Sequence, residues 1–552
     1  MEGVTPCPAF LPAHKGTGFP GGKTFMNNQR YVIGIDIGTT STKAVLFTEK
    51  GNTVCAHAVE YPLYTSTTAA AEQDPEEILS AVIKTVREVI ARSGIAPAKL
   101  VGLSFSAAMH SLIAVDAKGQ LLTKSMTWAD NRSAKWAEKI KQEQHGHEIY
   151  LRTGTPIHPM SPFVKLVWLR NEHPELFEQT AKFISIKEYV FYRFFQQYVV
   201  DHAIASATGL LNLKEFAWDQ EALEIAGITA AQLSELVPTT HVLQPIQDEL
   251  AQAMGILADT PTVIGASDGV LSNLGVGAIA PGIVAVTIGT SGAIRAVVER
   301  PITDPQERLF CYALTEKHWV IGGAVNNGGI ALRWVRDQLM DTEVATAKRL
   351  GQDPYDLLMR LAETVPPGAE GLIFHPYLMG ERSPLWDANA RGSFFGLSLN
   401  HTKTHLVRAV MEGILFNLSL VLQALEDFTG KATRIQATGG FARSHLWRQM
   451  MADVFDREVT VPEQYESSCL GAAVLGLYAL NEISSFNIVS EMIGETYRHE
   501  PIAANEETYK KILPIYTRVL QNLKGEYESI ARLQADLKPY SSFQMDKPHP
   551  DR

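Results

Sequence analysis

Two stretches of the chain repeat one pattern of apolar and polar positions. Residues 32–45 and 284–297 each begin with an apolar run, pass through an Ile-Gly-Thr-Thr or Ile-Gly-Thr-Ser turn, and continue in a second apolar run. Such runs on either side of a glycine-containing turn predict two β-hairpins. Glycine lets a backbone approach a ligand, and turn N–H groups and hydroxyls can bind an anion. The chain is therefore expected to hold one polyphosphate between two similar halves.

The remaining periodicity predicts an alternation of strands and helices. Strands are expected at residues 30–48, 53–63, 100–106, 112–115, 262–266, 283–298, 319–323 and 434–438. Helices are expected at residues 75–93, 133–145, 162–171, 182–195, 402–428 and 469–480, in the segments that follow 329 and 444, and beyond about 505. Strands that alternate with helices favour an α/β fold.

The length of the chain predicts more than one domain, because 552 residues exceed what a single hydrophobic core normally holds. Glycine and proline recur at 272–282, which places a boundary there. We expect a disordered Pro- and Gly-rich tail at 1–28, a first domain at 29–276 and a second at 277–505. A C-terminal helix and polar tail are expected at 506–552.

Charge and cysteine content exclude several classes of protein. The chain carries 49 Lys and Arg against 60 Asp and Glu, a formal net charge of −11. This balance argues against a nucleic acid partner, because a phosphate backbone needs a basic face. Four cysteines without a CxxC pair favour a reducing, cytoplasmic location. Turns interrupt every apolar run before about 18 residues, so no membrane span is expected.

An acidic residue, Asp36, directly precedes the first turn, Ile37-Gly38-Thr39-Thr40. A carboxylate beside phosphate-binding amides repels the phosphate unless a cation lies between them, and Mg²⁺ is the expected cation because it prefers oxygen ligands. The alternative is a turn-forming aspartate without a ligand. The second hairpin has Thr287 at the matching position, so only the first turn is expected to hold a metal.

A second acidic residue, Asp268, follows the apolar strand 262–266 and precedes Gly269. A carboxylate at a strand end between small residues is accessible and could accept a proton from a hydroxyl that attacks phosphorus. The alternative, an N-cap for a helix at 270–277, is equally compatible with the spacing.

Glycine pairs and a polar cluster complete the candidate chemistry. Gly328-Gly329 before a helix suits a phosphate, because helix N-termini favour anions, whereas Gly439-Gly440 could equally mark a tight turn. Residues 109–111 and 128–132 combine an apolar face with His110, Asp130 and Arg132. Such a mixture suits a polyol, and a carboxylate would favour arginine. A structural role for His110 is as compatible with the sequence as a ligand-binding one.

Longer motifs make the chain resemble the FGGY carbohydrate kinases of the actin- and hexokinase-like ATPase superfamily. Residues 160–172 are similar to one signature of that family, and residues 392–397 with 405–412 are similar to the other. The resemblance extends from 31 to about 500. It implies two actin-like (ribonuclease H-like) ATPase domains with an interdomain cleft, the first on the sugar-binding side and the second on the nucleotide-binding side.

Within the family, residues 107–111, 127–133, 152–159 and 265–273 are most similar to the members that phosphorylate gluconate. The resemblance implies a sugar acid and ATP as small-molecule partners, with Mg²⁺, Asp268 as the catalytic base and Asp36 beside the metal. Implied ATP-binding residues are Thr39, Thr40, Ser41, Lys43, Gly289, Thr290, Ser291, Gly329, Gly439, Gly440 and Ser444. Implied sugar-binding residues are Met109, His110, Trp128, Asp130, Arg132 and Asp268.

The identity of the acceptor stays open at this stage. Arg132 is the first candidate to hold the substrate carboxylate, and His110 is the second. Related pentulose kinases usually carry Asn where this chain has Gly269, which makes a pentulose a less expected substrate. The alternatives are a kinase for another sugar, such as xylulose, and an actin-like structural ATPase without a small acceptor. A homodimer is compatible with the sequence.

Overall fold

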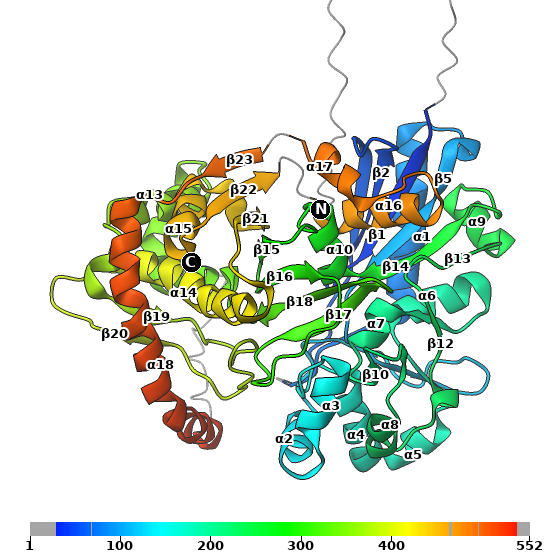
Figure 1. Ribbon diagram of the computed structural model, residues 1–552, viewed down its shortest axis with the longest axis horizontal. Helices are drawn as coiled ribbons and strands as arrows, with labels where there is room; N and C mark the ends of the chain where they lie inside the picture. Colours follow the sequence, from blue (N-terminus) through cyan, green and yellow to red (C-terminus); the bar gives the residue numbers. More distant parts are fainter. Residues whose placement is uncertain (1–28, 68, 463–465, 495, 538–552) are drawn as a thin grey trace, which may run out of the picture.

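A computed structural model describes residues 29–67, 69–462, 466–494 and 496–537, which form two α/β halves (Figure 1). The first half surrounds a six-stranded sheet and the second a seven-stranded sheet. The expected tail at 1–28 and the end of the expected polar tail lie outside the described residues. The division at 276/277 stays a prediction.

The first sheet begins with the predicted hairpin. In spatial order its strands are β13 (Val242–Leu243), β14 (Thr262–Ser267), β5 (Leu100–Ala107), β1 (Tyr31–Ile37), β2 (Ser41–Thr48) and β3 (Thr53–Glu60). Strands β1 and β2 are antiparallel, whereas β5 runs parallel to both β1 and β14. The carboxyl ends of β1, β5 and β14 therefore lie at one edge of this sheet.

The second sheet repeats this arrangement. In spatial order its strands are β17 (Phe310–Thr315), β18 (His318–Val325), β16 (Gly292–Val298), β15 (Ile283–Ile288), β21 (Arg434–Thr438), β22 (Glu458–Pro462) and β23 (Thr496–His499). The hairpin β15–β16 corresponds to β1–β2, and β21 runs parallel to β15 as β5 does to β1. The two hairpins predicted from the repeated pattern are thus confirmed, and each lies at the centre of its sheet.

Helices cover the two sheets. The longer helices of the first half are α1 (Pro75–Ser93), α2 (Ala134–Glu143), α3 (Gly146–Thr153), α4 (Pro162–Glu172), α6 (Ile186–Phe195) and α10 (Asp268–Gly275). Those that follow are α11 (Gly329–Leu339), α12 (Asp341–Arg349), α13 (Pro354–Glu363), α14 (Lys403–Thr429), α15 (His445–Phe455), α16 (Ser467–Ala479) and α18 (Ala503–Asp536). Successive side chains of β1 point to opposite faces and so belong to two different cores. Ile33 and Ile35 pack with α1, whereas Val32 packs with α10 and α16.

One predicted helix is shorter than expected. The segment 182–195 begins as a strand, β8 (Lys182–Ile184), which pairs with β6 (Ile113–Val115). Ser185 and Glu188 then form a capping box, in which each side chain accepts from the other residue's backbone N–H. The helix therefore begins at Ile186, and the expected start at 182 is wrong by one short strand.

Helix α14 is the core helix of the second half. It is long and apolar enough to cross a membrane by length and composition, but 83% of its most apolar window is buried inside the protein. It packs against β16, β18 and β19 (Ile373–His375). Burial by protein accounts for its apolar character.

Helices α10 and α16 connect the two halves. Helix α16 follows β22 of the second sheet but packs on β1, β5 and α10 of the first half (Figure 1). The approach depends on glycine: a Cβ atom on Gly471 would overlap the carbonyl of Leu271, and one on Gly275 would overlap that of Ser467. This close pair of helices holds the two hairpins near each other.

Candidate active site

A cavity of about 250 Å³ lies where the two sheets meet. The first half contributes Thr39, Met109, His110, Trp128, Met160 and Asp268 to its wall. The second half contributes residues that include Thr287, Gly289, Ser291, Arg295, Tyr312 and Arg382. The structure thus brings both predicted turns, the predicted base and three of the predicted sugar-binding residues to one cavity.

Asp268 is the first residue of α10 and borders the cavity. The N-cap position belongs to Ser267, and the Oδ1 atom of Asp268 accepts a 2.7 Å hydrogen bond from the N–H of Gly269. Burial raises the pKa of this carboxyl, while the guanidinium of Arg295, the Gly269 bond and Arg382 act in the opposite direction. The side chain is therefore available to accept a proton.

Asp36, near the end of β1, is the second carboxylate of this region. Its Oδ1 accepts a 2.6 Å hydrogen bond from the hydroxyl of Ser106 on β5. Burial raises the pKa of Asp36 to about 6, and the negative charge of Asp268 contributes to the rise. Two buried carboxylates that repel each other favour a cation near them.

The donor set near Asp36 fits a magnesium ion that binds mainly through phosphates and water. No group of three or more His, Cys, Asp or Glu side chains within the described ranges could hold a metal by itself. Mg²⁺ usually takes only one or two protein carboxylates in such sites. Lys43, predicted to bind ATP, instead pairs with Glu466, with its Nζ 2.7 Å from one carboxylate oxygen.

The second turn, Gly289-Thr290-Ser291, packs directly on the N-terminus of α11. The carbonyl of Gly289 accepts a 2.7 Å hydrogen bond from the N–H of Gly329. A Cβ atom on Gly329 would lie 2.7 Å from that same carbonyl, so no side chain fits there. The hydroxyl of Thr287 is buried without a hydrogen-bond partner in the structure. The N–H groups at the start of α11 are thus engaged by this turn, and the unpartnered hydroxyl of Thr287 is the group that fits a phosphate.

The Gly439-Gly440 turn follows β21. Gly439 has φ 107°, and a Cβ atom on it would overlap the carbonyl of Ile288 at the end of β15. Gly440 has no atom within 4 Å of the position of a Cβ, so its backbone is open to a ligand. Ser444 caps α15, its hydroxyl accepting from the N–H of Trp447. Its hydroxyl is already engaged at the helix start.

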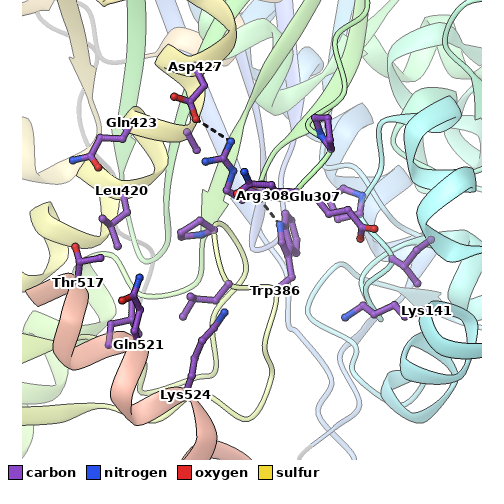
Figure 2. Close-up of a pocket in the computed structure, with 18 residues that line it drawn as sticks. Lys141, Glu307, Arg308, Trp386, Leu420, Gln423, Asp427, Thr517, Gln521 and Lys524 are labelled. Carbon is purple, nitrogen blue, oxygen red and sulfur yellow. Dashed lines mark hydrogen bonds and ion pairs between the residues drawn. The ribbon is translucent and has the colours of Figure 1, made fainter.

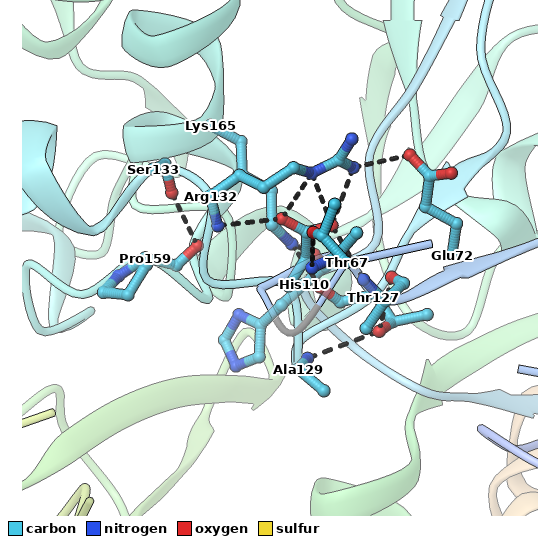
Figure 3. Close-up of polar contacts among 12 residues, drawn as sticks. Thr67, Glu72, His110, Thr127, Ala129, Arg132, Ser133, Pro159 and Lys165 are labelled. Atoms are coloured by element: carbon cyan, nitrogen blue, oxygen red, sulfur yellow. Dashed lines mark hydrogen bonds and ion pairs between the residues drawn. The ribbon is translucent and has the colours of Figure 1, made fainter. Parts of the chain in front are cut away.

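His110 lies between the cavity and the core of the first half. Its Nδ1 is 2.7 Å from the carbonyl of Ala207, so Nδ1 carries the hydrogen and Nε2 is left to accept. Burial lowers its pKa to about 3, and the ring is therefore neutral. The buried Nζ of Lys165 donates 2.7 Å hydrogen bonds to the carbonyls of His110 and Thr127 (Figure 3). Lys165 thereby fixes the two loops that carry His110 and Trp128.

Asp130 and Arg132 do not reach the cavity wall. Arg132 donates to Glu72 (Figure 3) and to both carboxylate oxygens of Asp130. Its guanidinium lies 4.8 Å from the ring centre of Trp168. Asp130 also accepts a 3.0 Å hydrogen bond from the N–H of Ala71. The Nε and Nη2 atoms of Arg132 thus fix a turn outside the cavity wall, and its contact with the substrate carboxylate stays a prediction.

Two arginines that the sequence analysis did not single out belong to the cavity wall. Arg295 on β16 and Arg382 both line the cavity, and the Nε of each is buried without a hydrogen-bond partner in the structure. The guanidinium of Arg382 lies 4.9 Å from the ring centre of Trp128 and donates to the carbonyl of Val325. The signal for Arg295 was a single charge inside the apolar run of the second hairpin.

A larger hollow of about 690 Å³ adjoins the cavity (Figure 2). Its wall includes Lys141 of the first half and Lys524 of α18, and Trp386 lines both spaces. The indole Nε1 of Trp386 donates to the carbonyl of Arg308, whose guanidinium pairs with Asp427 at 3.0 Å. Trp386 is therefore a fixed partition between the hollow and the cavity.

Comparison with known families matches most of the chain. A model described as the FGGY family of carbohydrate kinases, N-terminal domain, matches residues 31–275, and its C-terminal counterpart matches residues 284–480. The gluconokinase of Bacillus subtilis (strain 168) is 57% identical over 509 residues, which cover 92% of this chain and 99% of that protein. A xylulose kinase of the same organism is 27% identical over 498 residues, covering 90% and 97%.

Solved structures give the same fold. The gluconate kinase from Lactobacillus acidophilus has a TM-score of 0.86 and 39% identity, covering 91% of this chain and 100% of that one. A structure described as ligand-bound xylulose kinase from the same organism has a TM-score of 0.85, also with 39% identity, covering 91% and 100%. The predicted fold of two actin-like (ribonuclease H-like) domains is confirmed.

Proposed function

Since the chain belongs to the FGGY family of carbohydrate kinases, we propose that it transfers the γ-phosphoryl group of ATP to D-gluconate. The product would be 6-phospho-D-gluconate. The observation that carries the proposal is a cavity with one carboxylate, Asp268, and two arginines whose Nε atoms lack partners. A sugar acid supplies both the hydroxyl that a base needs and the anion that the arginines need.

The transfer needs one proton acceptor. The oxygen on C6 of gluconate forms a bond to the γ-phosphorus as the bond between that phosphorus and the β,γ-bridging oxygen breaks. The hydroxyl proton passes to Asp268, and ADP leaves with the bridging oxygen. Burial disfavours the ionised form of Asp268, whereas Arg295 and Arg382 favour this form, which is the one that accepts the proton.

The nucleotide would lie on the second half. The turn at Gly289 would hold phosphates with the help of the unpartnered hydroxyl of Thr287, and the open backbone at Gly440 would face the nucleoside. Asp36 would lie on the metal side, where Mg²⁺ would neutralise phosphate charge. Helices α10 and α16 keep the two turns in register, so that donor and acceptor meet.

A kinase for a neutral ketose such as xylulose is the second candidate. It is favoured by the Lactobacillus acidophilus structure described as a xylulose kinase, which is as similar to this chain as the gluconate kinase structure. The excess of arginine in the cavity favours the acid, and the curated xylulose kinases are only 25–28% identical to the chain.

A substrate panel tests the proposal. Purified protein is assayed for ADP release with gluconate, xylulose, ribulose and glycerol at equal concentrations. We expect kcat/KM for gluconate to exceed that for each neutral acceptor by at least about 100-fold, the scale that a desolvated ion pair provides. A preference for xylulose would replace gluconate by the second candidate. ATP turnover indifferent to every sugar would indicate an actin-like ATPase instead.

A further inference from the structure

A glycine in the first turn of α10, Gly269, gives room to the side chain of Arg295. A Cβ atom on Gly269 would lie 3.1 Å from Nη2 and 3.2 Å from Nε of Arg295, and 2.8 Å from Cε of Met109. Contacts of 3.1 and 3.2 Å are tight, so a side chain at this position would crowd the guanidinium and shift it by a few tenths of an ångström. Because Gly269 has no side chain, Arg295 can lie against the start of α10. Gly269 directly follows Asp268 in the sequence.

The strand that carries Arg295 places it toward the first half. Ile294 and Ala296, its neighbours on β16, belong to the core of the second half. Because successive side chains of a strand point to opposite faces, Arg295 lies on the face away from that core and toward α10. A single arginine therefore replaces an apolar side chain on the face where the two halves meet.

The cavity has an excess of positive charge. Among the described residues, neither Arg295 nor Arg382 has a carboxylate within the 4.0 Å of an ion pair, and the Nε of each lacks a partner. Burial lowers the pKa of Arg295, partly offset by the charge of Asp268. Burial also lowers the pKa of Arg382 to about 10, offset mainly by Glu381 and less by Asp268. A buried guanidinium whose Nε lacks a partner is costly, and an entering anion reduces that cost.

We propose that Arg295, with Arg382 beside it, binds the carboxylate of the sugar acid, and that Gly269 makes this arrangement possible. The inference rests on the proposed function, because it assigns a contact within that site. A guanidinium offers paired N–H groups that match a carboxylate. The pair Gly269–Arg295 thus determines selectivity for an acid over a neutral sugar of the same length. A side chain at 269 would crowd the guanidinium of Arg295, and a longer one would crowd it more.

The test compares gluconate with D-gluconamide, a neutral molecule of nearly the same shape. In the wild type we expect kcat/KM for gluconate to exceed that for gluconamide by about 100-fold or more. In Arg295→Met this ratio is expected to fall to within about tenfold of unity, through a higher KM for gluconate and with the KM for ATP little changed. Calorimetric binding of gluconate to nucleotide-free protein should weaken in parallel.

Two further variants serve as controls. Arg295→Lys keeps the charge and should restore part of the preference for gluconate. Arg300→Met removes an arginine from the exposed segment after β16 and should leave both substrates within about twofold of wild type.

Gly269→Asn tests the space that the proposal requires. It should reduce the preference for gluconate as Arg295→Met does, because the new side chain displaces the guanidinium. In the Arg295→Met background the same substitution should reduce the preference for gluconate little further, since the effects of substitutions at contacting residues do not add. Circular dichroism of each variant confirms that it is folded.

Each failure has its own signature. If the wild type does not phosphorylate gluconate, the proposed function fails. If the wild type does so but Arg295→Met still prefers gluconate over gluconamide by the original ratio, the function stands and this inference is overturned. A loss of equal size for both substrates would also overturn it, because Arg295 would then act only on Asp268.

Discussion

Asp268 lies under two opposing influences. Burial disfavours its charge, whereas Arg295 and Arg382 favour it. The net result is a pKa above that of a solvated aspartate, which suits the proposed role of a base. Asp36 lacks this compensation from an arginine, and its pKa is about 6. The two carboxylates therefore have separate environments, which suits separate roles.

Replacing Asp268 by Asn should nearly abolish phosphoryl transfer. The amide keeps the shape but cannot accept the proton, and positioned bases of this kind contribute roughly 10²–10⁴-fold. We expect kcat to fall by about that factor while ATP affinity, measured by calorimetry, changes little. A variant that kept most of its turnover would show that another group is the base.

As the pH is lowered, the rate should begin to fall at a pH above the pKa range of an ordinary aspartate; this fall is the acidic limb of the rate profile. Activity needs both carboxylates ionised, and both pKa values are raised, that of Asp36 to about 6. We expect kcat/KM to fall as the pH drops below about 6 at low Mg²⁺, and the limb to move to lower pH as Mg²⁺ rises, since a cation competes with the proton. A limb near pH 4 at every Mg²⁺ concentration would contradict this.

Protonation of these carboxyl groups does not unfold the protein, so unfolding would not account for that loss of rate. A carboxyl whose pKa is higher in the folded than in the unfolded protein binds protons more tightly when folded. For Asp36 the folded protein therefore gains stability as the pH falls from about 6 toward the ordinary value of 3.8. Thermal melting across the same pH window separates the two effects.

The sequence predicted part of the site, and its errors have physical causes. Asp36, Asp268 and the two turns could be found because each follows an apolar strand at a point where a sheet edge exposes it. Sequence alone does not show that Arg132 lies outside the cavity wall and pairs with Asp130 and Glu72. Arg295 was not singled out because Gly269, whose missing side chain gives it room, becomes its neighbour only in the folded protein.

At the scale of elements, periodicity and caps predicted most boundaries. Helix α1 matches its predicted bounds because Asp74 caps its start and Gly94, at φ 65°, ends it. The segment 182–195 was mispredicted because three strand residues preceding a capping box have the same apolar character as a helix. Packing partners decided that case, and local sequence could not.

The glycine contact between α10 and α16 makes a prediction about stability. In Gly471→Ala the added methyl group would overlap the carbonyl of Leu271, so the helices must separate. Overpacking of this kind typically costs about 1–3 kcal/mol, and we expect a melting temperature several degrees lower. Transfer should also slow, because both turns lose their common support.

A matched control exists in α18. Gly525 lies inside that helix, and a Cβ atom on it would meet nothing within 4 Å. Gly525→Ala should leave the melting temperature unchanged or raise it slightly, because alanine favours a helix. Equal destabilisation by both substitutions would show that the contact between α10 and α16 has no special role.

At the scale of the whole molecule, the duplication explains the position of the site. Six strands follow the same order in both sheets, with β17 added at the edge of the second, and the cavity forms between the turns of the two hairpins. The halves differ where chemistry requires it: Asp36 in one hairpin corresponds to Thr287 in the other. Sequence predicted this duplication, whereas the contact of α16 with the first sheet needed the folded structure.

The most direct test of the account is a crystal structure of the Asp268→Asn variant with gluconate, ATP and Mg²⁺. We expect the triphosphate between the turns at Thr39 and Gly289, the C6 hydroxyl within hydrogen-bond distance of residue 268, and the carboxylate on the cavity arginines. A triphosphate bound away from both turns, or a C6 hydroxyl directed away from residue 268, would contradict the central claim.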